Sequence, residues 1–347
     1  MKISITNKLL LDDIPPGVYK ELTQKLTIPN PKWIENHRMG RWNRGTPRYL
    51  KFYDQGSAGR LYIPRGYMRQ LVSMCNRHGE PYRFEDLRRN LPEVSFKFRG
   101  QLKPFQKKAV DVMLTKEFGT LSAATGSGKT IMALDIIAKR KQPTLIVVHT
   151  KELAFQWIER IATFLAIPTE EVGLIGAGKH TLGKKVTVSL VQSLYKCADD
   201  VSKGIGHLIV DECHRCPSRI FTDAVTEFDS RFMLGLSATP WRRDKLSKLI
   251  FWHLGDVHHE VDKNDLIIRG DVLSVEVILR ETDFEPYFDP VHDYSRMLAE
   301  LVSNDKRNHM IAADIAREAH NNKGICLVLS DRKNHCETLQ SLLRYRY

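Results

Sequence analysis

The sequence predicts an α/β fold in which helices cover both faces of a parallel sheet. Two observations predict it. Short apolar runs recur between residues 98 and 265, and segments of helical periodicity alternate with them. Apolar runs of this length are typical of strands buried on both faces, as in parallel sheets. The predicted strands are residues 119–123, 144–148, 186–190, 207–210 and 232–236.

Two other regions flank this pattern. Residues 1–95 are basic, aromatic and interrupted by Pro and Gly, and they predict a small α+β domain with short strands such as 49–53 and 60–63. After residue 265, a connecting stretch leads to a predicted helix at 293–320 and a buried strand at 324–329. We therefore divide the chain into residues 1–95, 96–270 and 271–347. One strand and one amphipathic helix are too little for a complete α/β domain, so we expect the last region to be incomplete.

Composition excludes several classes of protein. The chain is 42% hydrophobic and 27% charged, as in globular proteins with real cores. No apolar run approaches the roughly 18 residues of a membrane helix, and the N-terminus lacks the pattern of a signal peptide. Six cysteines without framework spacing suit a reducing compartment, so we expect a cytoplasmic protein. Cys213 and Cys216 form a C-x-x-C pair, but no second pair follows, which argues against zinc.

Positive charge is concentrated near the N-terminus. Of a net charge of +12, residues 1–100 carry 19 Lys and Arg against nine Asp and Glu, which indicates a polyanionic partner. No acidic residue lies between Glu35 and Asp54, where aromatic residues accompany the cations. The aromatic side chains could stack on unpaired bases or lie in the core of the small domain. The predicted DNA contacts in this segment are Arg38, Arg41, Arg44 and Arg48.

A phosphate-binding loop is predicted at residues 123–130, A-A-T-G-S-G-K-T, between an apolar run and a helical segment. Glycines let the backbone wrap around phosphates at a helix N-terminus. Lys129 would neutralise the β- and γ-phosphates, and the Thr130 hydroxyl would bind Mg²⁺. Ala123 stands where the general pattern has its first glycine. The predicted nucleotide-binding residues of the loop are Thr125, Gly126, Ser127, Gly128, Lys129 and Thr130.

Two adjacent carboxylates, Asp211 and Glu212, follow the predicted strand at 207–210. Because the carboxyl ends of parallel strands lie at one edge of a sheet, we expect this pair beside the phosphate-binding loop. There Asp211 would hold Mg²⁺ and Glu212 would polarise the attacking water, with Lys129 as the third catalytic residue. Cys213 would then point into the fold and could not bind a metal ion.

In this order, A-A-T-G-S-G-K-T, D-E-C-H (211–214) and S-A-T-P (237–240) resemble motifs I, II and III of superfamily 2 DExH helicases. The resemblance implies a RecA-like domain that uses ATP and Mg²⁺ and acts on DNA. It also implies that His214, Ser237 and Thr239 couple hydrolysis to domain movement. In L-K-P-F-Q, Gln106 matches the glutamine that reads adenine.

Further segments resemble motifs that contact nucleic acid. Residues 147–153 resemble motif Ia and residues 191–194 a further strand-contacting motif, which implies DNA contacts from Thr150, Lys151 and Gln192. Residues 327–339 resemble motif IV, the start of a second RecA-like domain. S-A-T-P-W-R-R-D (237–244) is most similar to the XPB/UvsW branch, although Arg243 stands where Glu is expected. That branch implies work on forks and Holliday junctions, in recombination or repair, in a bacterial or phage-infected cell.

No Q-x-x-G-R-x-x-R pattern, the arginine-finger motif of the family, follows residue 330. We therefore expect a truncated chain, by family analogy monomeric, that binds ATP–Mg²⁺ and DNA but turns over little. Three alternatives stay open: the motor subunit of a restriction or defence system, an ATP-gated clamp on nucleic acid, and an RNA helicase. His214 in place of Asp argues against the DEAD-box RNA branch.

Overall fold

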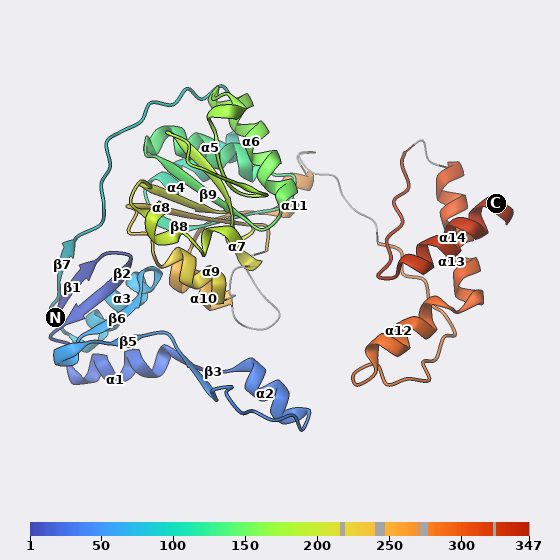
Figure 1. The fold of residues 1–347 in the computed structure, drawn as a ribbon, viewed down its shortest axis with the longest axis horizontal. Helices are drawn as coiled ribbons and strands as arrows, with labels where there is room; N and C mark the ends of the chain where they lie inside the picture. The colour runs from blue at the N-terminus through green and yellow to red at the C-terminus, as the bar shows by residue number, and fades with distance from the viewer. Residues whose placement is uncertain (216–218, 240–246, 269, 271–276, 322–323, 347) are drawn as a thin grey trace. The chain divides into compact units, whose positions relative to one another are not determined.

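The computed structural model describes residues 1–215, 219–239, 247–268, 270, 277–321 and 324–346. Its contacts divide the chain into two compact units, Met1–Ser274 and Val275–Tyr347 (Figure 1). The first unit holds both the basic N-terminal segment and the large sheet. The division of this unit near residue 95 stays a prediction.

The N-terminal segment folds around a five-stranded mixed sheet, with the strand order β5-β6-β2-β1-β7 in the described residues. Helices α1 (Pro16–Lys25) and α3 (Met68–His78) pack on it. Leu9, Leu22 and Leu71 are fully buried in the core between them. The strands are β1 (Lys2–Ile5), β2 (Lys8–Asp12), β5 (Asp54–Gln55), β6 (Leu61–Pro64) and β7 (Arg83–Asp86).

An arm, residues 27–51, extends from this sheet. Its base is a two-stranded antiparallel ribbon of β3 (Thr27–Pro29) and β4 (Tyr49–Lys51), and helix α2 (Pro31–Arg38) lies between them in sequence. The helix begins here because the Asn30 side chain accepts a hydrogen bond from the Lys32 backbone amide at 3.1 Å and proline occupies the first turn. No residue of α2 is buried. Helix α2 therefore presents its side chains to solvent or to a partner.

The large sheet has eight described strands in the order β11-β10-β12-β9-β13-β14-β8-β15. Strand β11 runs antiparallel to β10, and the other pairings in the described part of this sheet are parallel. The predicted fold class is confirmed, and each of the five predicted runs is a strand. The strands are β8 (Phe118–Ala123), β9 (Thr144–Val148), β10 (Gly173–Gly176), β11 (Lys179–Thr181), β12 (Val186–Leu190), β13 (His207–Val210), β14 (Phe232–Ser237) and β15 (Val257–Val261).

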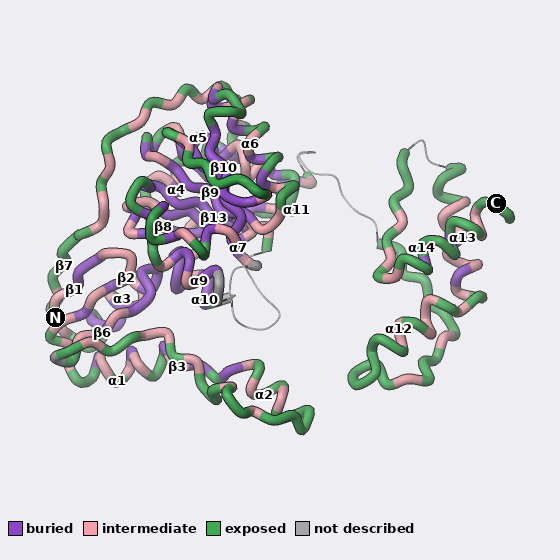
Figure 2. Tube along the Cα trace, viewed as in Figure 1, coloured by how far each residue is buried: buried purple, intermediate pink, exposed green. Residues whose placement is uncertain are grey.

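Alternate residues of the central strands enter two separate cores, one on each face. Figure 2 shows that the strands of the large sheet are mostly buried. Ile146 and Val148 of β9 pack in the first core, whereas Leu145 and Val147 pack in the second. The first core is covered by α4 (Pro104–Leu114), α5 (Lys129–Arg140) and α6 (Lys151–Leu165). The second core is covered by α7 (Val191–Leu194), α8 (Ala198–Ser202), α9 (Arg219–Val225) and α10 (Ser247–Leu254). Helix α11 (Lys263–Ile268) follows β15.

In the second unit, the single helix predicted at 293–320 is wrong in one respect. The segment forms two helices, α12 (Tyr294–Val302) and α13 (Asp305–Asn321), and α14 (Lys333–Arg346) follows. The break occurs because the Asn304 side chain accepts a hydrogen bond from the Arg307 amide at 2.8 Å, which starts a new helix.

The strand predicted at 324–329 is also wrong. This segment has no regular secondary structure, and Ile325, Leu327 and Leu329 are 100%, 78% and 82% exposed. An extended segment becomes a strand only when a neighbour satisfies its backbone amides and carbonyls. The described residues of this unit contain no strand that could pair with it.

No helix in the described part of the chain is long and apolar enough to cross a membrane.

Acid should destabilise the first unit through His253 of α10. Burial, and secondarily the charge of Lys8, lowers the pKa of His253 from 6.5 to about 4. Because the folded pKa lies below the unfolded one, this stabilisation is complete above pH 6.5 and is lost as the pH falls towards 4. When the pH is lowered from 7 to 4, we expect the unfolding free energy of wild type to fall by about 3 kcal/mol more than that of His253→Gln. Urea unfolding of both proteins at both pH values measures this difference. An equal fall in the two proteins would contradict the prediction.

Candidate active site

The candidate site lies where three neighbouring parallel strands end. Ser237 of β14 pairs with Ser122 of β8, and Gly235 of β14 pairs with Val210 of β13. The loop after β8, the end of β14 and the carboxylates after β13 therefore share one edge of the sheet. The acidic pair and the loop lie at the same edge of the sheet, as expected from the sequence. Strand β14 lies between β13 and β8, which places Ser237 in the middle of the site.

The loop after β8 has the backbone of an anion-binding turn. Gly126 and Gly128 have φ values of +84° and +85°, which favour glycine because a side chain would be strained there. A Cβ atom on Gly128 would also lie 2.5 Å from Nε2 of Gln106. Helix α5 starts at Lys129 without a side-chain cap, so no capping side chain covers the amides of its first turn. Free amides at a helix N-terminus bind phosphate.

Lys129 directly follows this turn, as the first residue of α5. Its Nζ donates a hydrogen bond to the carbonyl of Ala123 at 3.1 Å, and its side chain is half-buried. Thr130 is the next residue of α5 and is likewise half-buried, whereas Thr125 is exposed and Ser127 is buried. A glycine turn, a helix N-terminus and a lysine together fit the phosphates of a nucleotide.

Gln106 connects the loop to the preceding helix. Its Oε1 accepts a hydrogen bond from the Lys103 amide at 2.9 Å, and its Nε2 donates to the Ser127 carbonyl at 2.8 Å. Gln106 therefore fixes the loop against the start of α4, a role that the sequence did not indicate. Its predicted contact with adenine stays a prediction.

Trp157 of α6 holds the first carboxylate. Its indole Nε1 donates to Oδ2 of Asp211 at 2.8 Å, and the Glu212 amide donates to Oδ1 at 2.9 Å. Both oxygens of this buried carboxylate are thus oriented by the protein. Sequence reasoning missed Trp157 because a tryptophan on the apolar face of a helix has no signal that separates it from a core residue.

A chain of close polar contacts joins the second carboxylate to β14. Nδ1 of His214 lies 3.2 Å from Oε2 of Glu212 and 3.0 Å from Oγ of Ser237. Oγ of Ser237 also accepts from the Thr239 amide at 3.1 Å, so its own hydrogen can be donated to His214. The three residues predicted to couple hydrolysis to movement are therefore in contact with one another.

Cys213 is fully buried, and burial raises the pKa of its thiol well above the usual range. The described residues contain no group of three or more potential metal-binding His, Cys, Asp or Glu side chains. Cys216, Pro240, Arg242, Arg243 and Asp244 lie outside the described residues.

The predicted nucleic-acid contacts fall into two places. Strands β9 and β12 pair at Val148 and Leu190, so Thr150, Lys151 and Gln192 follow at the same sheet edge as the site. Thr150 caps α6 by accepting a hydrogen bond from the Leu153 amide at 3.3 Å. Lys151 and Gln192 are exposed.

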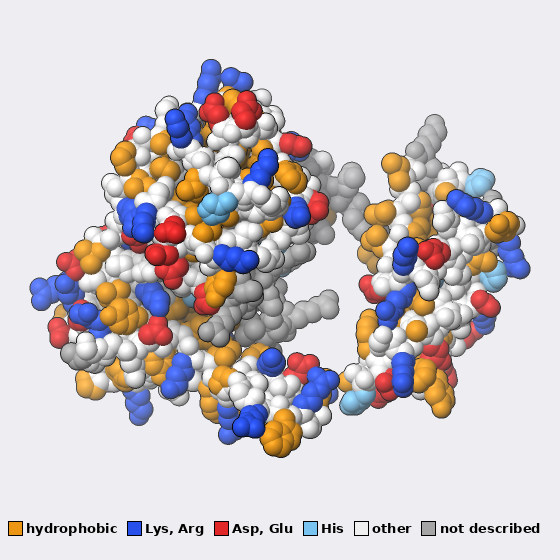
Figure 3. Space-filling view, viewed as in Figure 1, with side chains coloured by type: hydrophobic (Ala, Val, Ile, Leu, Met, Phe, Trp, Pro, Cys, Tyr) orange, Lys and Arg blue, Asp and Glu red, His pale blue; other side chains and the backbone are white. Residues whose placement is uncertain are grey.

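The four predicted arginines lie on the arm and are exposed. Figure 3 shows Lys and Arg side chains gathered with hydrophobic ones over the segment that carries α2. Arg48 lies over the ring of Trp33, and Trp42 is 85% exposed, whereas Phe52, which follows the arm, packs in the core. Phe52 therefore belongs to the core, whereas stacking of exposed aromatic side chains on unpaired bases stays a prediction. In the described part of the chain, no ion pair involves Arg38, Arg41, Arg44 or Arg48.

Comparisons with known proteins agree with this geometry. Residues 99–242 match the family model of the type III restriction enzyme, res subunit. The chain is 38% identical to "DNA 3'-5' translocase XPB2" of Sulfurisphaera tokodaii over 45% of this chain and 34% of that protein. It is 29% identical to "Putative ATP-dependent RNA helicase L396" of Acanthamoeba polyphaga mimivirus over 98% of this chain and 64% of that protein. This chain is therefore similar in sequence to proteins that are described as helicases and translocases.

Among solved structures, two of the UvsW helicase of bacteriophage T4 share the fold of this chain. Each has a TM-score of 0.58, at 18% and 17% identity. The first match covers 75% of this chain and 100% of the other, and the second covers 100% and 73%. At these identities the matches establish a RecA-like fold. The chain spans less than two thirds of the length of both curated relatives named above.

Replacing Trp157 by Phe should weaken Mg²⁺-dependent nucleotide binding. The ring keeps its place in the core, but Asp211 loses the indole hydrogen bond that orients it. Loss of such a supporting contact typically costs about tenfold or more in metal affinity. Titrating Mg²⁺ against binding of a fluorescent ATP analogue measures this, with Trp33→Phe on the arm as control. An unchanged Mg²⁺ requirement would show that Trp157 only fills the core.

Proposed function

We propose that this chain carries the ATP-binding motor domain of a DNA helicase or translocase that acts on branched DNA in recombination or repair. The observation that carries the proposal is the contact chain from Glu212 through His214 to Ser237. In it the Glu212 carboxylate contacts His214, and His214 contacts Ser237 at the end of β14, next to the strand that precedes the glycine turn. An ATPase that converts hydrolysis into movement needs such a connection.

Each predicted site residue has a role in this proposal. Lys129 and the N-terminal amides of α5 hold the β- and γ-phosphates, and Gln106 keeps the loop in place and reads adenine. Thr130 and Asp211 hold Mg²⁺ through oxygen ligands. Glu212 accepts a proton from water. His214, together with Ser237 and Thr239, responds to the protonation state of Glu212. ATP–Mg²⁺ supplies the phosphoanhydride bond whose hydrolysis drives the cycle.

DNA would contact two surfaces. Thr150, Lys151 and Gln192 follow the backbone at the sheet edge, next to the nucleotide. The arm supplies cations that neutralise phosphates and an exposed indole at Trp42 that can stack on an unpaired base. Unpaired bases beside duplex occur at forks and four-way junctions, which is why we propose branched DNA as the substrate.

Two other functions have a specific observation in their favour. The matched family model is described as a restriction enzyme subunit, which favours the motor of a restriction or defence system. The mimiviral relative is described as an RNA helicase. His214 and the similarity to the XPB2 translocase support DNA over RNA.

Substitutions in the site should separate binding from turnover. Lys129→Ala removes the cation at the phosphates and should abolish ATP binding. Glu212→Gln keeps the shape of the site and should bind ATP as wild type does, with turnover lower by roughly 100-fold or more. Hydrolysis is measured without nucleic acid and with single strands, linear duplex, four-way junctions and RNA duplex.

The sequence has no Q-x-x-G-R-x-x-R pattern after residue 330, so we expect low turnover by this chain. A version extended by a second motor domain should turn over fastest on junctions. Preference for RNA would favour the RNA helicase. No response of either version to any nucleic acid would refute the proposed function.

Substitutions in the arm should weaken DNA binding without affecting ATP binding. If Arg41 and Arg44 each neutralise one phosphate, the double variant to Ala should lower the slope of log affinity against log salt by roughly 0.9 per arginine. Fluorescence anisotropy of labelled junctions at several salt concentrations measures the slope. Arg83→Ala, which removes an exposed charge from β7, is the matched control. An equal effect of both substitutions would mean that the arm has no special role.

A further inference from the structure

Helix α10 belongs to two cores. It packs against β8 and β14 of the large sheet, against the turn η4 (Cys213–Arg215) that carries His214, and against the turn η2 (Arg65–Tyr67) of the N-terminal segment. In Figure 1 it is drawn beside α9, below the large sheet. This helix follows Ser237 and Thr239 in sequence, so it stands close to the candidate site along the chain as well as in space.

The side chains of α10 divide between the two cores. Ile250 and Leu254, four residues apart, pack in the motor core with Cys213. Leu249 and Trp252, three residues apart, pack in the N-terminal core and are only 4% and 5% exposed. On the side of the large sheet, α10 packs tightly against β14. A Cβ atom on Gly235 of β14 would lie 3.1 Å from Leu254 and 3.3 Å from the Cys213 sulfur.

On the N-terminal side the fit is equally tight. A Cβ on Gly66 would lie 2.2 Å from the carbonyl oxygen of Phe251 and 2.7 Å from that of Trp252, so backbone meets backbone. Arg65, 2% exposed, donates to the Ser230 carbonyl at 2.8 Å beside this contact. A displacement of α10 is therefore passed to the N-terminal segment, because close-packed interfaces do not deform continuously.

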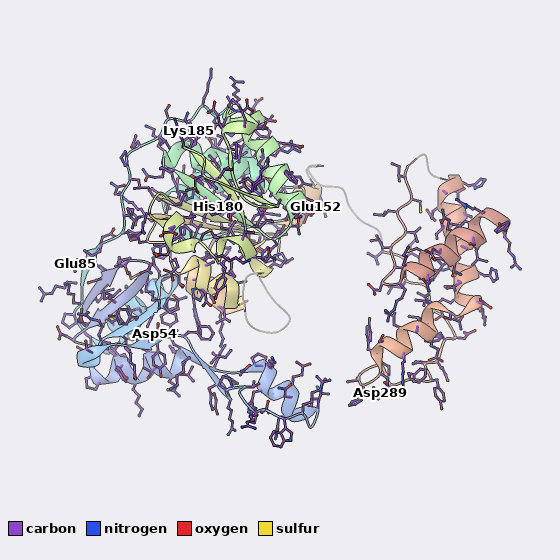
Figure 4. The ribbon with its side chains drawn as sticks, viewed as in Figure 1. Asp54, Glu85, Glu152, His180, Lys185 and Asp289 are labelled. Carbon is purple, nitrogen blue, oxygen red and sulfur yellow. The ribbon has the colours of Figure 1, made fainter. Side chains whose placement is uncertain are left out.

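Trp252 extends this connection to the arm. Its ring makes edge-to-face contacts with Phe52 at 5.2 Å and Tyr67 at 5.8 Å between centroids. Phe52 directly follows β4 of the arm, and its amide donates to the Leu26 carbonyl at 2.9 Å, just before β3. Asp54, labelled in Figure 4, pairs with Lys8 of β2 at 2.7 Å and returns the chain to the N-terminal sheet. The contact of Phe52 with Trp252 thus lies at the root of the arm.

We propose that α10 couples the nucleotide site to the DNA-binding arm, with Trp252 as the positioning residue that transmits the change to Phe52. The inference rests on the proposed function. A change in the contacts of His214 with Glu212 and Ser237 shifts η4 and the end of β14. Helix α10, packed against both, moves Trp252 and with it the root of the arm. The reverse holds as well: DNA on the arm alters affinity for nucleotide by the same factor.

The test measures this linkage in the 347-residue chain. Anisotropy gives the Kd for a labelled four-way junction with and without a non-hydrolysable ATP analogue, and the ratio of the two values is the coupling. For wild type we expect a ratio of roughly 5- to 150-fold. Trp252→Leu and Phe52→Leu each remove the ring contact from one side and keep an apolar residue. Both should bring the ratio close to one while nucleotide binding without DNA stays intact.

Two further variants separate coupling from stability. Trp252→Phe keeps a ring against Phe52 and should retain most of the ratio. Leu22→Ala opens a cavity on α1 in the same core and should lower thermal stability while leaving the ratio unchanged.

The outcomes are distinct. A ratio that persists in both leucine variants, or that is lost equally in Leu22→Ala, overturns the role of Trp252. Wild type that binds junctions with no nucleotide effect overturns the coupling but leaves the proposed function standing. Failure of wild type to bind any DNA overturns both.

Discussion

The parallel pairing of β14 between β8 and β13 is the constraint on which the rest of the structure depends. Its register brings Ser237 level with the start of the glycine turn after β8 and with the carboxylates that follow the neighbouring strand. Because parallel strands all end at the same edge, residues separated by more than a hundred positions meet there without a dedicated binding element. The hydrogen bond between His214 and Ser237 depends on this register, and so does the position of α10, which packs on β14.

Much of the fold could be predicted because its central strands are buried on both faces. Such strands are short and largely apolar, and all five in the centre of the large sheet were recognised. The strands of the large sheet that escaped recognition have other physical reasons for their composition. Strand β11 is exposed at an edge, β15 carries two histidines and a glutamate, and β10 begins and ends with glycine. The error at residues 324–329 has the opposite origin, since an apolar run is a strand only if a partner strand lies beside it.

The residues of the candidate site also fall into two groups, those that the sequence could predict and those that it could not. Residues whose chemistry depends on local sequence, such as Lys129 after its glycine turn and the Asp211–Glu212 pair after an apolar strand, could be assigned from spacing. Residues that act through tertiary contacts could not. Trp157 and Trp252 are both large apolar residues on helices, and no pattern distinguishes the one that orients a carboxylate from the one that enters a second core. The function of Gln106 as a brace also became visible only from its two partners.

The shared helix has a consequence for how the protein is made. The core of the N-terminal segment includes Leu249 and Trp252, which are synthesised well over a hundred residues after the strands that they complete. Translation proceeds at about 5–20 residues per second, so this core stays open for on the order of ten seconds while the large sheet emerges. Domains are usually expected to fold in the order in which they leave the ribosome. Here a segment that is translated before the large sheet should close only after that sheet has emerged.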